Sequence, residues 1–302
     1  MSEHETAPQK GTLQLVSRST YVREMLLQSL FFLCAFMFVL VVALIFIFVG
    51  WKAWPIVTDY GLMQFVRGSV WSSGTGQFGI LPLIAGSLIV TLGALALGTP
   101  LAVGTAVFLS DVASPRVRSL VRPAVELLAG VPSVVYGFFG IILLRSIVAR
   151  FTGTLGFGAF TAWIVLAIMI VPTIAALSED ALRSIPEGIR EASYAMGATQ
   201  WQTIYKVVIP AAKIGIIDAI ILGMGRAIGE TMAVLMVVGN APVLPKGIFA
   251  PLSTMTTQIV MDMPYAVGLH RTALFAMAAM LFIFSMLLVA TVRLSSRLRY
   301  RA

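Results

Sequence analysis

The chain has 302 residues, of which 59% are hydrophobic and only 11% are charged, and its mean hydropathy is +0.95. A soluble domain cannot cover so much apolar surface with so little charge, so an ordinary soluble enzyme is excluded and an all-α integral membrane protein is indicated. The net charge is +8, but the basic residues flank apolar runs and form no single patch, which indicates membrane orientation and not nucleic-acid binding.

Six apolar runs are long enough to cross a hydrocarbon core, which takes about 20 residues. We predict transmembrane helices over 26–50, 80–109, 124–148, 157–178, 214–239 and 272–293. The second run contains Pro100, so we expect a kink or a break there. Because the runs are spread through the chain, we predict one transmembrane domain over 26–293, between a cytoplasmic tail over 1–25 and a basic cytoplasmic tail over 294–302. The first run is too long for a cleaved signal and is expected to stay as an anchor.

The orientation follows from the positions of the 21 Lys and Arg residues. Fourteen of them lie in the two tails and in the second and fourth connections, six lie in the other connections, and Arg226 lies inside an apolar run. Cytoplasmic loops carry the excess of positive charge, so both termini are predicted to be cytoplasmic.

The fourth connection, about 179–213, is predicted to be ordered. Pro186 can open a short helix and Gly197 can end it. Thr199 and Gln202 have the spacing of a capping box, which would start a second short helix that Pro210 stops. We therefore expect a helix, a turn and a helix at the cytoplasmic surface.

Motifs for catalysis, nucleotide binding and metal binding do not occur in the sequence. It has no G-x-x-x-x-G-K-[ST] loop, no paired Cys or His spacing, a single cysteine at Cys34, and two isolated histidines, His4 and His270. Enzymatic chemistry within this chain is therefore not indicated, and we predict no catalytic residue, no metal and no cofactor of its own. Energy for uphill transport would then come from an ion gradient or from a separate ATPase.

Two charged residues, Arg226 and Glu230, stand inside the fifth apolar run. On a helix, residues four apart share one face and reach each other. Charges at bilayer depth must face the bundle interior or an aqueous path. One interpretation is that Glu230 only neutralises Arg226 and fixes the fold; the other, which we favour, places both residues on a substrate path, where a planar guanidinium suits an oxyanion.

The cytoplasmic loop resembles the EAA loop of ABC importer permeases. The pattern is Glu-Ala-Ser, three residues, Gly, nine residues, Val, one residue, Ile-Pro, and it departs from the family by Ser for the second Ala and by Val and Ile at the aliphatic positions. The resemblance implies that the first short helix docks on an ATPase subunit, with Ala192 and Gly197 allowing close contact and Glu191 making a polar contact. The alternative is a surface helical hairpin without a partner. The residues that the resemblance assigns to ATPase coupling are Glu191, Ala192, Ser193, Gly197, Ile209 and Pro210.

Four further stretches, 78–110, 126–140, 172–193 and 225–240, resemble phosphate-specific ABC importer permeases of the PstC type. The resemblance implies a six-helix type I permease in a prokaryotic cytoplasmic membrane. It implies as partners a PstA-type permease, two ATPase copies that bind ATP and Mg²⁺, and an external phosphate-binding protein. It also implies that Arg226 meets phosphate and that Glu230 holds the guanidinium when the path is empty.

Other functions stay open from the sequence. A permease for another oxyanion, such as molybdate or sulfate, would share the same fold. An ion-coupled secondary carrier would use Arg226 and Glu230 as a proton or ion relay, and inverted repeats would support it. A membrane scaffold or sensor would leave uptake intact when Arg226 is neutralised.

Overall fold

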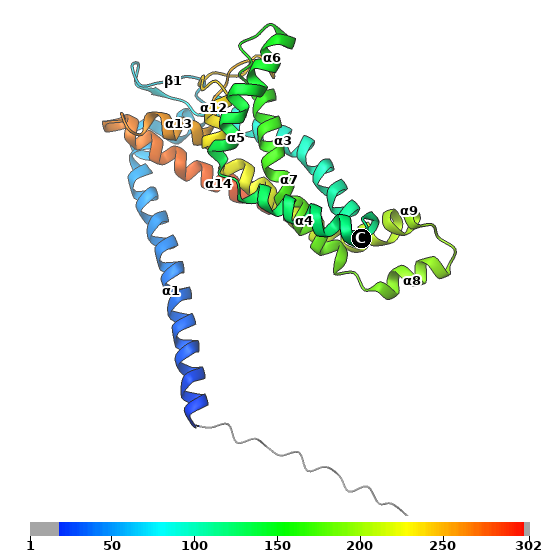
Figure 1. Cartoon of the computed structure of the whole chain (residues 1–302). Helices are drawn as coiled ribbons and strands as arrows, with labels where there is room; N and C mark the ends of the chain where they lie inside the picture. Colours follow the sequence, from blue (N-terminus) through cyan, green and yellow to red (C-terminus); the bar gives the residue numbers. More distant parts are fainter. Residues whose placement is uncertain (1–17, 299–302) are drawn as a thin grey trace, which may run out of the picture. The chain divides into compact units, whose positions relative to one another are not determined.

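The computed structural model describes residues 18–298, which are mostly helical (Figure 1). The chain divides into two units, residues 1–48 and residues 49–302. The predicted tails fall largely outside the described residues. In chain order the elements are α1 (Arg18–Pro55), η1 (Ile56–Gly61, a π-helix), α2 (Leu62–Arg67), β1 (Trp71–Ser72), β2 (Gln77–Phe78), α3 (Leu81–Val107), η2 (Phe108–Val112), α4 (Pro115–Gly130), α5 (Ser133–Phe139), η3 (Gly140–Leu144), α6 (Arg145–Thr152), α7 (Ala159–Arg183), α8 (Glu187–Ala195), α9 (Gln200–Thr203), η4 (Ile204–Val208), α10 (Ile209–Ala211), α11 (Lys213–Gly229), α12 (Met232–Val237), α13 (Met255–Asp262) and α14 (Gly268–Leu298).

The first unit is the greater part of α1. Its side chains from residue 23 onward are almost all exposed, and most of them are Leu, Phe, Val, Ile and Met. A helix that is apolar all round and exposed in the isolated chain is suited to lipid, as the predicted anchor requires.

The second unit is built around α7, which lies beside α3 (Figure 1). Close approach is possible because Gly93 lies under the ring of Trp163, where an added Cβ would be 2.0 Å from the ring. The indole Nε1 of Trp163 donates a hydrogen bond to the carbonyl of Ile89 at 2.8 Å, which satisfies its polar atom inside the contact. α11 packs on α7 as well, and together these helices supply much of the main apolar core.

Five described segments are long and apolar enough to cross a membrane, and a bent pair of helices makes a sixth. The five are Arg23–Arg67, Leu81–Val112, Ser133–Thr152, Ala159–Arg183 and Gly268–Ala290, and the pair is Gln200–Ala211 with Lys213–Gly229, bent by 69°. Of the kink or break expected near Pro100, the break is absent, because α3 continues through that residue to Val107. Pro100 has no backbone N–H, so α3 lacks one helical hydrogen bond there. The packing of α3 on α7 nevertheless keeps the helix continuous.

The third and fifth predicted spans have different boundaries in the structure. The run over 124–148 is interrupted because Val131 and Pro132 are extended, with ψ of 130° and 137°, and a residue before proline is driven out of the helical region. α4 therefore ends at Gly130 and the third span begins at Ser133. The run over 214–239 is interrupted at Glu230, whose ψ is 126°, so α11 ends at Gly229.

The loop after α7 has the predicted helix, turn and helix. The capping box of Thr199 and Gln202 is formed with both hydrogen bonds, and Gly197 follows α8 with φ +82°. The prediction that Pro210 stops the second helix is wrong: Pro210 lies in the first turn of α10, where proline is tolerated, and the chain turns only at Ala212. α8 has no buried residue, and Figure 1 shows α8 and α9 beyond the end of α7.

A second apolar cluster lies away from α8 and α9, near the short hairpin of β1 and β2 (Figure 1). Trp71 donates its indole N–H to Asp262 Oδ2 at 2.8 Å, and the same oxygen is 3.0 Å from Nε2 of His270. The His270 ring is stacked on Phe78 with centroids 5.3 Å apart. These contacts join the hairpin to α13 and to the start of α14.

Candidate functional site

Arg226 lies in the last turn of α11 and is half-buried. Its Nη1 donates to Thr173 Oγ1 of α7 at 2.8 Å, and its Nη2 lies 3.4 Å from the carbonyl oxygen of Ala129, in the last turn of α4. The last carbonyls of a helix lack partners within the helix and carry its partial negative charge, so a guanidinium is favoured at this position. Arg226 thus connects α11 with α4 and α7.

Glu230 has a different environment. Its Oε1 accepts a hydrogen bond from the backbone N–H of Ala233 at 3.1 Å, in the first turn of α12, and its carbonyl accepts from Thr256 Oγ1 at 3.2 Å. The side chain therefore satisfies a free N–H at the start of a helix.

The expected contact between Arg226 and Glu230 is not formed. The i, i+4 argument requires a continuous helix, and α11 ends at Gly229. Among the described residues Arg226 has no ion pair with any carboxylate, and its hydrogen-bond partners are the hydroxyl of Thr173 and the carbonyl of Ala129. A guanidinium held only by neutral oxygens keeps its full positive charge available to an anion.

Three of the residues assigned to ATPase coupling lie on the surface. Glu191 and Ala192 of α8 are exposed, and so is Gly197 in the following turn. Gly197 has open space around it, with no atom within 4 Å of an added Cβ. These residues are accessible to a partner.

Of the other three assigned residues, two are half-buried and one is exposed. Ser193 shares a hydrogen bond of 2.9 Å with Thr203, which fastens α8 to α9. Ile209 packs against a small buried cluster that includes Ala106 of α3 and Leu182 of α7, whereas Pro210 is exposed. The structure thus connects the second half of the loop to the membrane helices through apolar contacts.

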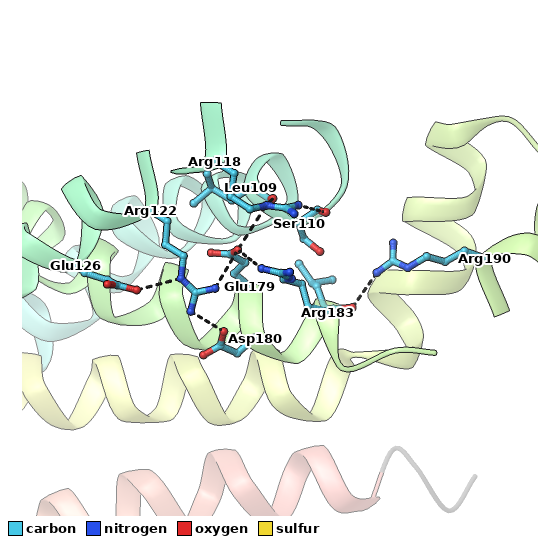
Figure 2. Close-up of polar contacts among 10 residues, drawn as sticks. Leu109, Ser110, Arg118, Arg122, Glu126, Glu179, Asp180, Arg183 and Arg190 are labelled. Carbon is cyan, nitrogen blue, oxygen red and sulfur yellow. Dashed lines mark hydrogen bonds and ion pairs between the residues drawn. The ribbon is translucent and has the colours of Figure 1, made fainter. Parts of the chain in front are cut away.

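A group of charged residues lies where α4, α7, η2 and α8 meet, and we call it the polar junction; Figure 2 shows most of its side chains. At its centre is Glu179 near the end of α7, whose side chain is only 1% exposed. Its Oε1 is 3.5 Å from Nη1 of Arg122, 3.6 Å from Nη1 of Arg183 and 3.9 Å from Nε of Arg118. The members of the polar junction are Asp111, Arg118, Arg122, Glu179, Asp180, Arg183 and Arg190.

Arg122 of α4 has three carboxylate partners (Figure 2). Besides Glu179, it contacts Glu126 at 3.0 Å and Asp180 at 3.1 Å. The hydrogen bond to Glu126 raises the pKa of Arg122, and partial burial opposes this effect. The charges of Glu179 and Asp180 add to the increase, so the pKa lies above its ordinary value. Its charge is therefore constant at physiological pH.

Asp111 in η2 connects the polar junction to both short helices of the loop. Its carboxylate forms an ion pair with Arg190 of α8, and its carbonyl accepts from Nε2 of Gln200 in α9 at 2.8 Å. Arg190 also donates through Nη2 to the carbonyl of Leu182 in α7 at 2.9 Å. One residue at the foot of the α3 span is thus attached to α8 and to α9.

The polar junction was not predicted from the sequence. In the sequence, the arginines of the second connection, Arg116, Arg118 and Arg122, indicate only orientation, and Glu179 stands at the start of the fourth connection. The signals available in the sequence are that Glu179 directly follows a long apolar run, precedes Asp180 and stands four residues before Arg183. Pairing between residues 57 or more positions apart cannot be read from spacing, because no helical period relates them.

Comparison with known proteins places the chain beside membrane transport subunits. Residues 98–299 match the family described as binding-protein-dependent transport system inner membrane component. A probable ABC transporter permease, YqgH of Bacillus subtilis, is 38% identical, with 87% of this chain and 88% of the relative covered. The phosphate transport system permease PstC of Pasteurella multocida is 33% identical, with 88% of this chain and 89% of the relative covered.

Solved structures share the fold. A bacterial alginate ABC transporter, in complex with an alginate-pentasaccharide-bound periplasmic protein, has a TM-score of 0.61 and 16% identity, with 93% of this chain and 95% of that chain covered. An inward-facing methionine ABC transporter has a TM-score of 0.51 and 24% identity, with 71% of this chain and 94% of that chain covered. At these identities the likeness concerns the fold alone.

Proposed function

Because the chain belongs to the family of binding-protein-dependent transport system inner membrane components, whose members are transport subunits and not enzymes, we propose that it forms a membrane path for inorganic phosphate. The relatives named as phosphate permeases support this substrate, since several are at least 30% identical over most of the chain. The chain is a multi-pass protein of the inner membrane.

The observation that carries the proposal is the environment of Arg226. Its guanidinium lies between three helices and is held by Thr173 and by the carbonyl of Ala129, without a carboxylate among the described residues. A buried charge that is not neutralised by the protein is costly unless it faces water or binds a counter-ion. Phosphate oxygens fit the planar fork of an arginine, so we place Arg226 on the substrate path.

Glu230 is proposed to border the same path. Its carboxylate accepts a hydrogen bond from the first turn of α12. This helix begins three residues after Gly229, which is the last residue of α11. A monohydrogen phosphate retains one proton, which a carboxylate could accept in a hydrogen bond. The hydrogen bond from the backbone N–H of Ala233 to the Glu230 carboxylate would compete with the contact to phosphate. This competition would favour release of phosphate, since conduction requires sites that are not too tight.

The proposed partners follow from the exposed loop and from the family. The surface of α8 with Glu191 and Ala192 would dock on an ATPase, which would bind ATP and Mg²⁺ and supply the energy. Two ATPase copies, a PstA-type permease and an external phosphate-binding protein would complete the importer.

The test is uptake of labelled phosphate into vesicles that carry the whole complex, with ATP inside. We expect ATP-dependent uptake in the wild type and a loss of about tenfold or more in Arg226→Gln, which corresponds to a charge-assisted contact of a kcal/mol or more. Arg226→Lys keeps the charge but loses the fork, so it should retain intermediate uptake. Uptake that is independent of ATP, or that sulfate or molybdate suppresses as well as unlabelled phosphate, would contradict the proposal.

A further inference from the structure

We infer that the polar junction carries movement of the cytoplasmic loop to the two helices that hold Arg226, with Asp111 and Glu179 as its positioning residues. This inference rests on the proposed function, because it assumes that an ATPase moves α8 and α9. It concerns residues outside the loop motif and outside the substrate path.

The first step is the attachment of the loop. The side chain of Asp111 pairs with Arg190 of α8, and its carbonyl binds Gln200 of α9 at 2.8 Å. Asp111 belongs to η2, which continues the membrane span that begins at Leu81. A displacement of either short helix therefore acts on the foot of α3.

The second step leads from η2 to α4 and α7. Arg118 of α4 donates to the carbonyls of Leu109 and Ser110 at 2.5 and 2.6 Å, and its Nε is 3.9 Å from Glu179 (Figure 2). Glu179 also attracts Arg122 of α4 at 3.5 Å. A single buried carboxylate of α7 thus faces two arginines of α4.

The third step is the link to Arg226. α4 carries Arg122 at the polar junction and Ala129 at its far end, and α7 carries Glu179 at the polar junction and Thr173 less than two turns earlier. The two groups that hold the guanidinium, Ala129 and Thr173, are therefore on the same two helices that Glu179 joins. Rigid helices transmit displacement along their length, so a shift at the polar junction changes the position of both partners of Arg226.

Some buried side-chain oxygens at the polar junction have no hydrogen-bond partner among the described residues, and a contact that moves requires such free acceptors. In the described part of the chain, five buried side-chain oxygens lack a hydrogen bond. Two of them, Asp111 Oδ2 and Glu179 Oε1, belong to the polar junction, and two more, Ser110 Oγ and Ser178 Oγ, lie on the residues directly before these. The arginine contacts of Glu179, at 3.5–3.9 Å, are longer than charge-assisted hydrogen bonds of about 2.7–2.9 Å. Free acceptor capacity lets the arginines shift between arrangements without leaving the carboxylate unpaired.

The experiment compares phosphate transported per ATP hydrolysed in the reconstituted complex. We expect Glu179→Gln and Asp111→Asn to lower this ratio by about fivefold or more while ATP hydrolysis continues. Glu126→Gln is the matched control, because Glu126 contacts the same Arg122 but is 54% exposed, and it should stay within about twofold of the wild type. Glu179→Asp keeps the charge and should recover most of the ratio that Glu179→Gln loses.

The inference is overturned if Glu179→Gln assembles and keeps the wild-type ratio, or if Glu179→Gln and Asp111→Asn both fail to assemble, which would make the residues purely structural. A wild-type complex that imports no phosphate would contradict the proposed substrate instead. The polar junction would then be judged by the stimulation of ATP hydrolysis by the external binding protein, which Glu179→Gln should abolish and Glu126→Gln should keep.

Discussion

Arg226 and Glu230 show how a charged residue is accommodated in an apolar helix bundle when it forms no ion pair with another described residue. Each lies at a helix end of suitable polarity: Arg226 at the last carbonyls of α4, and Glu230 at the first N–H groups of α12. Partial charges at helix ends stabilise such groups by about 0.3–1 kcal/mol each, and more when they are partly buried. The interrupted helices therefore create the positions in which these two charges are tolerated.

Thr173 should be required for the position of the guanidinium. Thr173→Val keeps the shape of the side chain but removes the hydroxyl that accepts from Arg226 Nη1. A lost hydrogen bond to a charged group costs about 1.5–3 kcal/mol, so we expect phosphate uptake to fall about tenfold while the complex still assembles. Initial uptake rates measure this, and Thr173→Ser, which restores the hydroxyl, should behave as the wild type. Equal rates for Val and Thr would show that the contact is dispensable.

At the scale of elements, the turn after α8 depends on one backbone conformation. Gly197 has φ +82°, which costs a residue with a side chain roughly 1–2 kcal/mol. Gly197→Ala should therefore shift α8 and reduce both ATP-driven uptake and the amount of ATPase that copurifies. Gly188→Ala is the control, because Gly188 lies within the exposed α8, has ordinary φ and has open space around it. A Gly197→Ala complex with full uptake would contradict the role of this turn.

The contact between α3 and α7 should be sensitive to a single methyl group. In Gly93→Ala the added Cβ would meet the ring of Trp163 at 2.0 Å, and such overpacking costs about 1–3 kcal/mol. We expect a lower Tm of the detergent-solubilised protein. Gly104→Ala on the same helix has no atom within 4 Å of the new Cβ, so its Tm should be unchanged or slightly higher. Indistinguishable Tm values for the two variants would mean that the helices separate easily.

The sequence predicts the elements well where one rule acts alone. Apolar length identified the spans of α1, α3, α7 and α14, and cap chemistry identified the box at Thr199. The rules failed where a local break was hidden within an apolar run, as at Pro132 and Glu230, because hydropathy averages over the residues that end a helix. The polar junction could not be predicted, since the pairing of Glu179 with α4 depends on tertiary packing.

At the scale of the whole molecule, orientation can be tested with single cysteines, because Cys34 is the only one in the sequence. In a Cys34→Ser background, Met196→Cys lies beside the turn after α8 and Tyr265→Cys lies between α13 and α14; the native side chains are 89% and 84% exposed. The positive-inside rule predicts that an impermeant thiol reagent labels residue 265 from outside and residue 196 only after the membrane is opened. Labelling of residue 196 from outside, and of residue 265 only after the membrane is opened, would show that the predicted orientation is inverted.

The neutral surroundings of Arg226 have a consequence for the energetics of the membrane potential. Moving an anion into a cell that is negative inside costs about 2.3 kcal/mol per charge for each 100 mV, so a doubly charged anion meets roughly twice that opposition. On the proposed path, the guanidinium of Arg226, which forms no ion pair among the described residues, would lower the electrostatic barrier to the anion, but it would leave the total electrical work unchanged. In the proposed importer that work would be delivered from the cytoplasmic side, through the exposed loop of α8 and α9.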